Sequence, residues 1–331
     1  MQNRRKLLWT LAWAVVSVLL FFCFRNIQWA RVWTELAGLD IAWLAPAIIM
    51  NLSILGLWAL QWEVFLPRSY SVPLSRMTEI AALISMTLNT VPFFAGHLLG
   101  VMLLWKRQRV GTAAALSLLA LDQLAEGLAK VSVFLLLGLF TPIPLWMKKG
   151  ILLVTIAVAS LFVLLYMLAR RYRLAPGKGE KAPGPPLGRA MGFVAQWANY
   201  LEALRSTRQF CVGLGLAMAM KGSEAIAIWA VQKAFGISLP LWTVFLVLAA
   251  LALATMVPIS PGNLGVYEAV VFFIYKYLGI PPEQAMGLAL IQHLCYLLPM
   301  VGTGYLCIIL RYFYPAERPK PSPYTPGPGS K

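Results

Sequence analysis

Long apolar runs alternate with short polar and basic stretches along almost the whole chain. Several runs reach about 20 residues, which at roughly 1.5 Å per residue lets a helix cross a hydrocarbon layer about 30 Å thick. Because lipid cannot satisfy backbone polar groups, such segments must be helical. The pattern therefore predicts an all-α polytopic membrane protein. The apolar segments are Leu7–Phe24, Ile41–Phe65, Met77–Trp105, Thr112–Phe140, Gly150–Ala169, Phe210–Val231, Leu241–Leu278 and Gln284–Leu310.

Two of these segments are long for a single helix and are interrupted in the middle. Met77–Trp105 contains proline and glycine near Pro92, and Leu241–Leu278 contains them near Pro258. Proline removes a backbone donor and clashes with the preceding turn, whereas glycine tolerates a bend. Each segment is therefore expected to be two helices meeting at a corner, either re-entrant or crossing twice, with both ends on one side. The resulting fold prediction is about six full spans and two helix hairpins.

Composition and charge agree with this class of protein. The chain is 60% apolar and 12% charged, which excludes a water-soluble domain because soluble chains are about 25% charged. A net charge of +16 suggests cytoplasmic loops and anionic lipid rather than nucleic acid. With a cytoplasmic N-terminus, 20 of the 28 lysines and arginines fall inside, 6 outside and 2 within spans. We expect a multi-pass inner (plasma) membrane protein with both termini cytoplasmic, lipid partners, no nucleic acid and no cofactor.

The apolar runs also set the domain limits. Leu7–Phe24 is too long for a typical signal peptide and lacks a small-residue cleavage site, so it is expected to remain as the first span. In residues 171–208, a stretch rich in glycine and proline precedes apolar residues at helical spacing beside arginines. This stretch predicts a flexible cytoplasmic linker followed by an interfacial amphipathic helix. The first transmembrane half is then 1–170 and the second 209–314, with a disordered tail at 315–331.

The two corners share a pattern at a constant offset of 166 residues. Val91-Pro92-x-x-x-Gly96-x-Leu98 matches Val257-Pro258-x-x-x-Gly262-x-Leu264, and the flanking spans follow the same shift. Because the first broken pair opens from the inside and the second from the outside, the repeats are predicted to be antiparallel. Inverted repeats with discontinuous helices are typical of secondary transporters, and the corner backbone then faces protein or a wet cavity. Kinks that only serve packing are the alternative.

Charged side chains within the spans are candidates for a substrate or proton pathway. Asp122, Glu126 and Lys130 follow one another at four-residue intervals on one helix face, and charges at that depth require a partner or water. Asp122 has no obvious local partner, which favours it for proton transfer or headgroup contact. Glu126 with Lys130, and Lys221 with Glu224, fit structural ion pairs equally well.

Further candidates lie at and after the corners. His97 and Asn263 each follow a corner glycine, so both are expected to face one cavity, into which the helix beginning near Gly262 points its partial positive charge. His293 can relay protons near neutral pH, although a hydrogen-bonded structural role is the commoner one. The candidate residues are Asn89, Pro92, Gly96, His97, Asp122, Glu126, Lys130, Lys221, Glu224, Pro258, Pro261, Gly262, Asn263, Glu268, Gln292 and His293. No catalytic motif or metal-ligand spacing accompanies them.

The corners also resemble a known family. Pro258-Ile-Ser-Pro-Gly-Asn-Leu-Gly-Val-Tyr-Glu268 resembles the signature of the flippase-like, lysylphosphatidylglycerol synthase transmembrane-region family. Asn89-Thr-Val-Pro-Phe-Phe-Ala-Gly96 resembles its first-half counterpart. The resemblance implies movement of a lipid rather than catalysis, and it implies a functional acidic residue at Glu268.

The chain departs from the family pattern at the first corner. The family commonly has Pro-x-Arg-x-Gly-Glu followed by another Arg, where this chain has Phe94, His97 and Gly100. An anionic headgroup would then rely on other groups, and a less charged, polycyclic or neutral lipid becomes more plausible. Since only residues 311–331 follow the last span, we expect no soluble aminoacyltransferase domain and no lysyl transfer.

Three functions fit these observations. The leading hypothesis is a proton- or gradient-linked transporter that moves a lipid or lipid-linked headgroup between leaflets. Under this hypothesis the protein is not an enzyme. The second is an intramembrane enzyme that modifies a lipid headgroup with Asp122, Glu126 and His293 as acid–base groups. The third is a noncatalytic scaffold that assembles lipid-modifying enzymes through the basic loop at 170–208. The lipid, the direction, the driving ion and the oligomeric state are not specified by the sequence.

Overall fold

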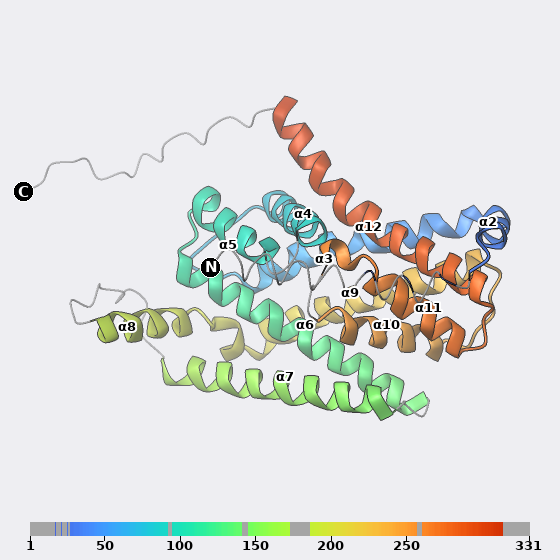
Figure 1. Cartoon of the computed structure of the whole chain (residues 1–331). Helices are drawn as coiled ribbons and strands as arrows, with labels where there is room; N and C mark the ends of the chain where they lie inside the picture. The colour runs from blue at the N-terminus through green and yellow to red at the C-terminus, as the bar shows by residue number, and fades with distance from the viewer. Residues whose placement is uncertain are drawn as a thin grey trace, which may run out of the picture.

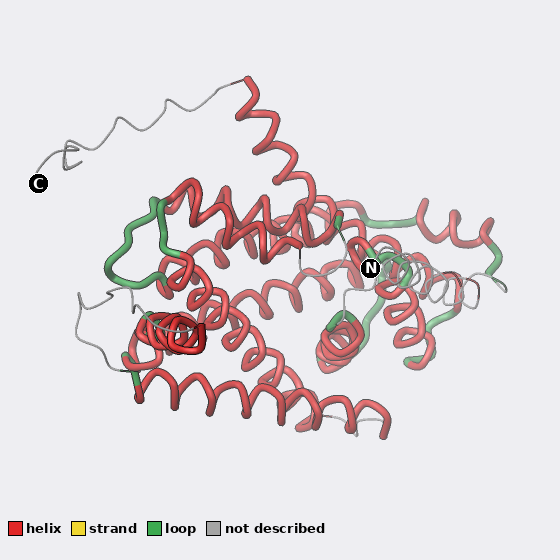
Figure 2. Tube along the Cα trace, turned by 60° about the vertical axis from the view of Figure 1, so that its left-hand side comes forward, coloured by secondary structure: helices red, strands yellow, loops and turns green. Residues whose placement is uncertain are grey.

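The computed structural model describes residues 27–91, 95–140, 145–172, 186–256 and 260–313, together with Ser17, Phe21 and Arg25. Within these residues all regular structure is helical (Figure 2), and five helices are long and apolar enough to cross a membrane. The predicted all-α polytopic fold is therefore confirmed. The five helices are α3 (Leu44–Phe65), α6 (Thr112–Phe140), α7 (Leu145–Arg171), α9 (Thr207–Ala234) and α12 (Pro282–Phe313).

Three predicted features lie largely or wholly outside the described residues. They are the first span at 7–24, the glycine- and proline-rich part of the linker at 173–185, and the tail at 315–331.

Both long segments are broken, as predicted. The first consists of α4 (Leu74–Thr90) and α5 (Ala95–Gln108), and the second of α10 (Trp242–Ala254), the 3-10 turn η3 (Pro261–Asn263) and α11 (Val266–Tyr277). These helices have 12 to 17 residues, hence lengths of about 18–26 Å, less than the ~30 Å hydrocarbon layer. The helices of each pair pack together, so each segment has the form of a helix hairpin. Pro92 and Pro258 themselves are outside the described residues.

Small residues allow the first hairpin to close tightly. A methyl group at Gly96 would lie 2.4 Å from Leu88 Cγ, and one at Gly100 would lie 2.5 Å from Ile84 Cδ1. Neither position has room for a side chain, because both contacts are far below van der Waals distance. The glycines that mark the corner in the sequence therefore also bring α5 against α4.

The two halves are related as an inverted repeat. Helices α3 and α9 occupy equivalent places and run antiparallel: Asp40 N donates to Ala234 O (3.0 Å) at one end, and Gln61 Nε2 donates to Gly213 O (3.0 Å) toward the other. Helix α4 packs against α12, and its counterpart α10 packs against α6. In each case a helix of one hairpin packs against the long helix that follows the hairpin of the other half (Figure 1).

Two short helices occupy equivalent places at opposite ends of the molecule. Helix α2 (Trp29–Ala37) with the 3-10 turn η1 (Ile41–Trp43) precedes α3, and α8 (Pro186–Asn199) with η2 (Glu202–Arg205) precedes α9. Figure 1 places α2 at one end of the bundle and α8 at the other. This is the arrangement expected of a repeat whose second half is inverted. Helix α7 lies along the outer edge of the bundle.

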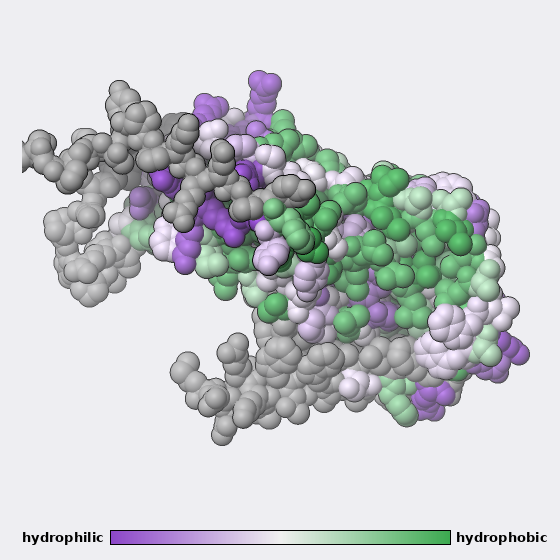
Figure 3. Space-filling model, turned by 90° about the horizontal axis from the view of Figure 1, so that it is seen from above, coloured by the Kyte–Doolittle hydropathy of each residue, from purple (hydrophilic) through white to green (hydrophobic). Residues whose placement is uncertain are grey.

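The apolar side chains form two buried clusters and an apolar surface. One cluster gathers around α9–α12 with the end of α6, and the other around α3–α6 with the beginning of α9. Outside, Figure 3 shows a broad hydrophobic surface, with hydrophilic residues gathered toward the ends of the molecule. Such a surface is what a lipid-facing protein requires.

Candidate functional site

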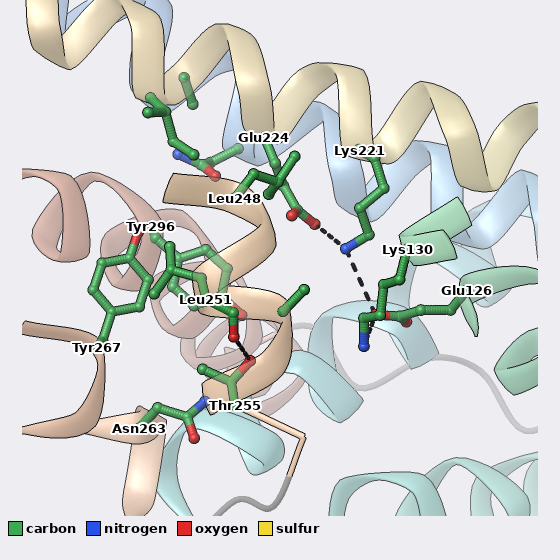
Figure 4. A pocket seen from close by; sticks show the side chains of 14 residues that line it. Glu126, Lys130, Lys221, Glu224, Leu248, Leu251, Thr255, Asn263, Tyr267 and Tyr296 are labelled. Carbon is green, nitrogen blue, oxygen red and sulfur yellow. Dashed lines mark hydrogen bonds and ion pairs between the residues drawn. The ribbon is translucent and has the colours of Figure 1, made fainter. Parts of the chain in front are cut away.

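A polar cavity of about 170 Å³ lies where the two halves meet. Residues of α3, α6, α9, α10, η3, α11 and α12 contribute to its wall, so both repeats form it (Figure 4). A cavity lined by polar groups holds water or a polar ligand rather than remaining empty. The lining residues are Asn51, Glu126, Lys130, Lys221, Glu224, Ala227, Ile228, Leu248, Leu251, Ala252, Thr255, Asn263, Tyr267 and Tyr296.

Four charged side chains form a continuous chain along the cavity. Lys130 Nζ lies 3.0 Å from Glu126 Oε1, Lys221 Nζ lies 3.6 Å from the same oxygen, and Lys221 Nζ lies 2.6 Å from Glu224 Oε1. Both pairs expected from helical spacing are present, and the contact between Lys221 and Glu126 joins them across the two halves (Figure 4). From Lys130 through Glu126 and Lys221 to Glu224 the charges alternate in sign, and the four charges sum to zero.

The chain of charges has two different ends. Lys130 contacts Glu126 at the cationic end, whereas Glu224 contacts Lys221 at the anionic end. A buried charge that loses its partner is costly because its desolvation is no longer offset. The cavity therefore suits a polar or charged ligand better than an apolar molecule.

The two corners contact each other beside this cavity. A methyl group at Gly262 would lie 2.9 Å from Asn89 O, so the second corner reaches the backbone at the end of α4. Gly262 has φ +57° and Asn263 has φ +54°, a left-handed backbone that η3 requires after Pro261. Asn263 lines the cavity, and its Oδ1 is buried without a hydrogen-bond partner in the described structure. It is therefore an acceptor available to a ligand or water.

Glu268 and His293 hold the second corner in place. His293 Nε2 lies 2.9 Å from Gly262 O, which can only accept, so this nitrogen carries a proton. His293 Nδ1 lies 2.7 Å from Glu268 Oε1, and one further proton is shared between them. Because the other oxygen of Glu268 accepts the Gly265 N–H at 2.6 Å, this carboxylate also caps α11.

The Glu268 carboxylate also bears on an expectation about the corner. The helix after Gly262 was expected to offer its N-terminus to an anionic ligand in the cavity. Glu268 occupies one backbone donor at that terminus, the Gly265 N–H, and a carboxylate in the first turn is favourable there.

Asp122, a candidate for proton transfer or headgroup contact, lies away from the cavity wall. It is 1% exposed and is not among the residues that line the cavity. Its Oδ1 accepts the indole N–H groups of Trp58 at 2.8 Å and Trp62 at 2.9 Å, and its Oδ2 accepts from Gln123 at 3.1 Å. Its two indole partners lie on α3, about sixty residues earlier in the chain, which is why the sequence shows no obvious local partner for this carboxylate.

His97 and Gln292 also lie beside the cavity rather than on its wall. His97 Nε2 lies 3.2 Å from Gln123 Nε2. His97 and Asn263 were expected to face the same cavity, but only Asn263 lines it. Gln292 Nε2 donates to Tyr267 OH at 3.0 Å and thereby orients a ring that does line the cavity. Among the residues predicted for the site, Glu126, Lys130, Lys221, Glu224 and Asn263 are the ones on the wall.

Several wall residues were not predicted. Tyr267 stacks on His293 with ring centroids 4.1 Å apart, and Tyr296 lies one helical turn after His293. Asn51 in α3, and Thr255 directly after α10, are isolated polar residues in apolar segments, a signal that would have identified them. The tyrosines gave no such signal, because aromatic residues are common throughout the spans.

No group of three His, Cys, Asp or Glu side chains in the described part of the chain is placed to hold a metal ion. The cavity wall presents carboxylates, ammonium groups, phenols, amides and the hydroxyl of Thr255.

Comparison with known proteins places the chain among membrane proteins. A "UPF0104 membrane protein" of Methanothermobacter thermautotrophicus (strain Delta H) is 20% identical over 275 residues, which cover 77% of this chain and 81% of that protein. The family described as the lysylphosphatidylglycerol synthase TM region matches residues 9–304, which include both hairpins and every residue that lines the cavity. The chain belongs to the lysylphosphatidylglycerol synthase TM region family.

Proposed function

We propose that this protein is a transporter that moves a lipid or a lipid-linked headgroup between the leaflets of the inner (plasma) membrane. The observation that carries the proposal is the charged cavity where the two inverted halves meet, lined by the second hairpin (α10, η3 and α11) together with α3, α6, α9 and α12. Discontinuous helices at a repeat interface place a polar site inside a bilayer without exposing unpaired backbone to lipid. In this proposal both chain termini are cytoplasmic, as the distribution of lysine and arginine predicts.

The dimensions of the cavity fit a headgroup and not a whole lipid. A volume of about 170 Å³ accepts a small polar group while the hydrocarbon chains stay in the bilayer. The four charges sum to zero, so the cavity as a whole favours neither anions nor cations. This balance agrees with the absence of arginine at the first corner.

Exchange of ion pairs gives the transporter a way to admit its substrate. Glu126 holds both lysines, at 3.0 Å from Lys130 and 3.6 Å from Lys221. In the proposed step a phosphate or hydroxyl of the headgroup replaces Glu126 at one lysine, and Glu126 takes up a proton or turns to the other lysine. Coupling to a proton gradient would then act at Glu126 rather than at Asp122, whose oxygens already accept three hydrogen bonds.

The geometry favours transport over an intramembrane enzyme. Of the three acid–base groups proposed for such an enzyme, Glu126 lines the cavity, whereas Asp122 and His293 do not. General acid–base catalysis requires the groups to reach the same reacting atoms. We therefore propose that the protein has no catalytic activity.

The test is a leaflet-exchange assay in proteoliposomes with a panel of labelled phospholipids and glycolipids. The wild-type chain is expected to exchange at least one lipid class faster than empty liposomes, and Glu126→Gln is expected to lower that rate at least tenfold. Lys276→Gln, which changes a charge at the end of α11 away from the cavity, is the matched control and should retain the wild-type rate. Exchange equal to that of empty liposomes for every lipid would refute the proposal.

A further inference from the structure

Three arginines converge on one carboxylate where α4 begins and α5 and α12 end. Arg76 Nη1 lies 3.2 Å from Glu79 Oε2, Arg107 Nη1 lies 3.8 Å from Glu79 Oε1, and Arg311 Nε contacts Glu79 Oε1. The charge distribution predicts that this end of the molecule is cytoplasmic. The positive-inside rule accounts for arginines at this end but not for their convergence on one side chain.

The charges of this arginine cluster, Arg76, Arg107 and Arg311 around Glu79, are not balanced. Three guanidinium groups face one carboxylate, which leaves two positive charges in excess. The Glu79 side chain is 14% exposed, whereas the three arginine side chains are 33–44% exposed, so the excess charge faces outward. Burial, and next the nearby charge of Arg311, lower the pKa of Arg107, as expected where like charges are held together.

Exposed apolar side chains extend from the cluster along both helices that end there. On α5 they are Leu98, Met102 and Trp105, at positions one turn apart on one helix face. On α12, the residues Tyr305, Ile309 and Tyr312 repeat at the same spacing and are also exposed. The cluster therefore lies at the polar end of two apolar faces.

We infer that the arginine cluster is a binding site for the headgroup phosphate of an anionic phospholipid, whose acyl chains lie along the exposed apolar faces of α5 and α12. Guanidinium groups bind phosphate oxygens in a bidentate manner, and an anion among Arg76, Arg107 and Arg311 neutralises charge that Glu79 leaves uncompensated. Basic sites between helix ends at the cytoplasmic side suit such lipids. The cluster is separate from the central cavity, because none of its four residues lines it.

The test measures lipid binding to the purified full-length chain by native mass spectrometry. Phosphatidylglycerol is compared with phosphatidylcholine of the same acyl chains, and the wild-type chain is expected to bind the anionic lipid at least fivefold more tightly. Arg107→Gln should lower the affinity for phosphatidylglycerol at least threefold, and Arg107→Gln with Arg311→Gln should lower it at least tenfold. Phosphatidylcholine binding should not change.

The control variant is Arg170→Gln, because Arg170 lies at the same end of the molecule on α7 and packs over Tyr166 rather than on Glu79. It should retain the wild-type affinity. An equal loss in Arg170→Gln would overturn the inference and assign binding to general surface charge, and equal affinity of the wild type for both lipids would also overturn it. Competition by millimolar inorganic phosphate would assign the site to a free anion instead of a lipid.

Arg107→Gln leaves Glu79 with two other arginines, so this variant is expected to fold. Its unfolding temperature in lipid-free detergent, measured beside the binding, should match that of the wild type. The binding assay does not depend on transport, so failure of either proposal leaves the other open to its own test.

Discussion

Lys221 on α9 lies 3.6 Å from Glu126 on α6, Nζ to Oε1, and so joins the two ion pairs of the cavity into one chain that spans both repeats. Each pair alone is a contact within one helix. Because this contact joins α6 of the first half to α9 of the second, the four charges come together only when the two halves are assembled.

Lys221→Met should therefore destabilise the protein through the charges it leaves behind. Glu224 loses its ion-pair partner and Glu126 loses one of its two, so the free energy of unfolding is expected to fall by about 2–4 kcal/mol. Removing Glu224 as well, in Lys221→Met with Glu224→Met, should recover at least half of that loss. Unfolding in mixed micelles would measure both, and a double variant no more stable than the single one would contradict the charge-pair explanation.

Asp122→Asn is expected to be mild for transport. An amide oxygen can still accept the indole N–H groups of Trp58 and Trp62, and Asp122 does not line the cavity. The exchange rate in proteoliposomes should fall less than threefold, against at least tenfold for Glu126→Gln. If the two losses were reversed in size, Asp122 and not Glu126 would be the group that couples to protons.

Gly262→Ala tests the contact between the corners. The left-handed φ of +57° disfavours any side chain, and the new methyl group would lie 2.9 Å from Asn89 O, so a loss of about 1–3 kcal/mol of stability is expected. Gly222→Ala in α9 is the matched control, because no atom lies within 4 Å of its added methyl group. Alanine is the better helix former, so the control should be neutral or slightly stabilising in the same unfolding assay.

Glu268→Gln separates the two roles of that side chain. The amide oxygen can still accept the Gly265 N–H, so the cap of α11 should persist, while the proton shared with His293 is lost. Glu268→Ala removes both contacts and should cost about 1–2 kcal/mol more in unfolding free energy. Equal stability of the two variants would show that the cap contributes nothing.

The sequence by itself determined the spans from Ile41 onward, the two breaks and the inverted repeat. Each depends on local properties: the length of an apolar run, the backbone restriction of proline and glycine, and a fixed offset between two corners. For the same reason the ion pairs at helical spacing, Glu126 with Lys130 and Lys221 with Glu224, were predicted and are present.

Only the tertiary structure decided which side chains meet from distant segments. Asp122 looked unpartnered because its indole donors lie on α3, and the link between Lys221 and Glu126 depends on how α6 packs against α9. Apolar helices can pack at many rotations with similar burial of hydrophobic area, so their sequence alone does not fix which polar residues face one another. The energy of those few buried polar contacts selects one arrangement, and it exists only after the helices have assembled.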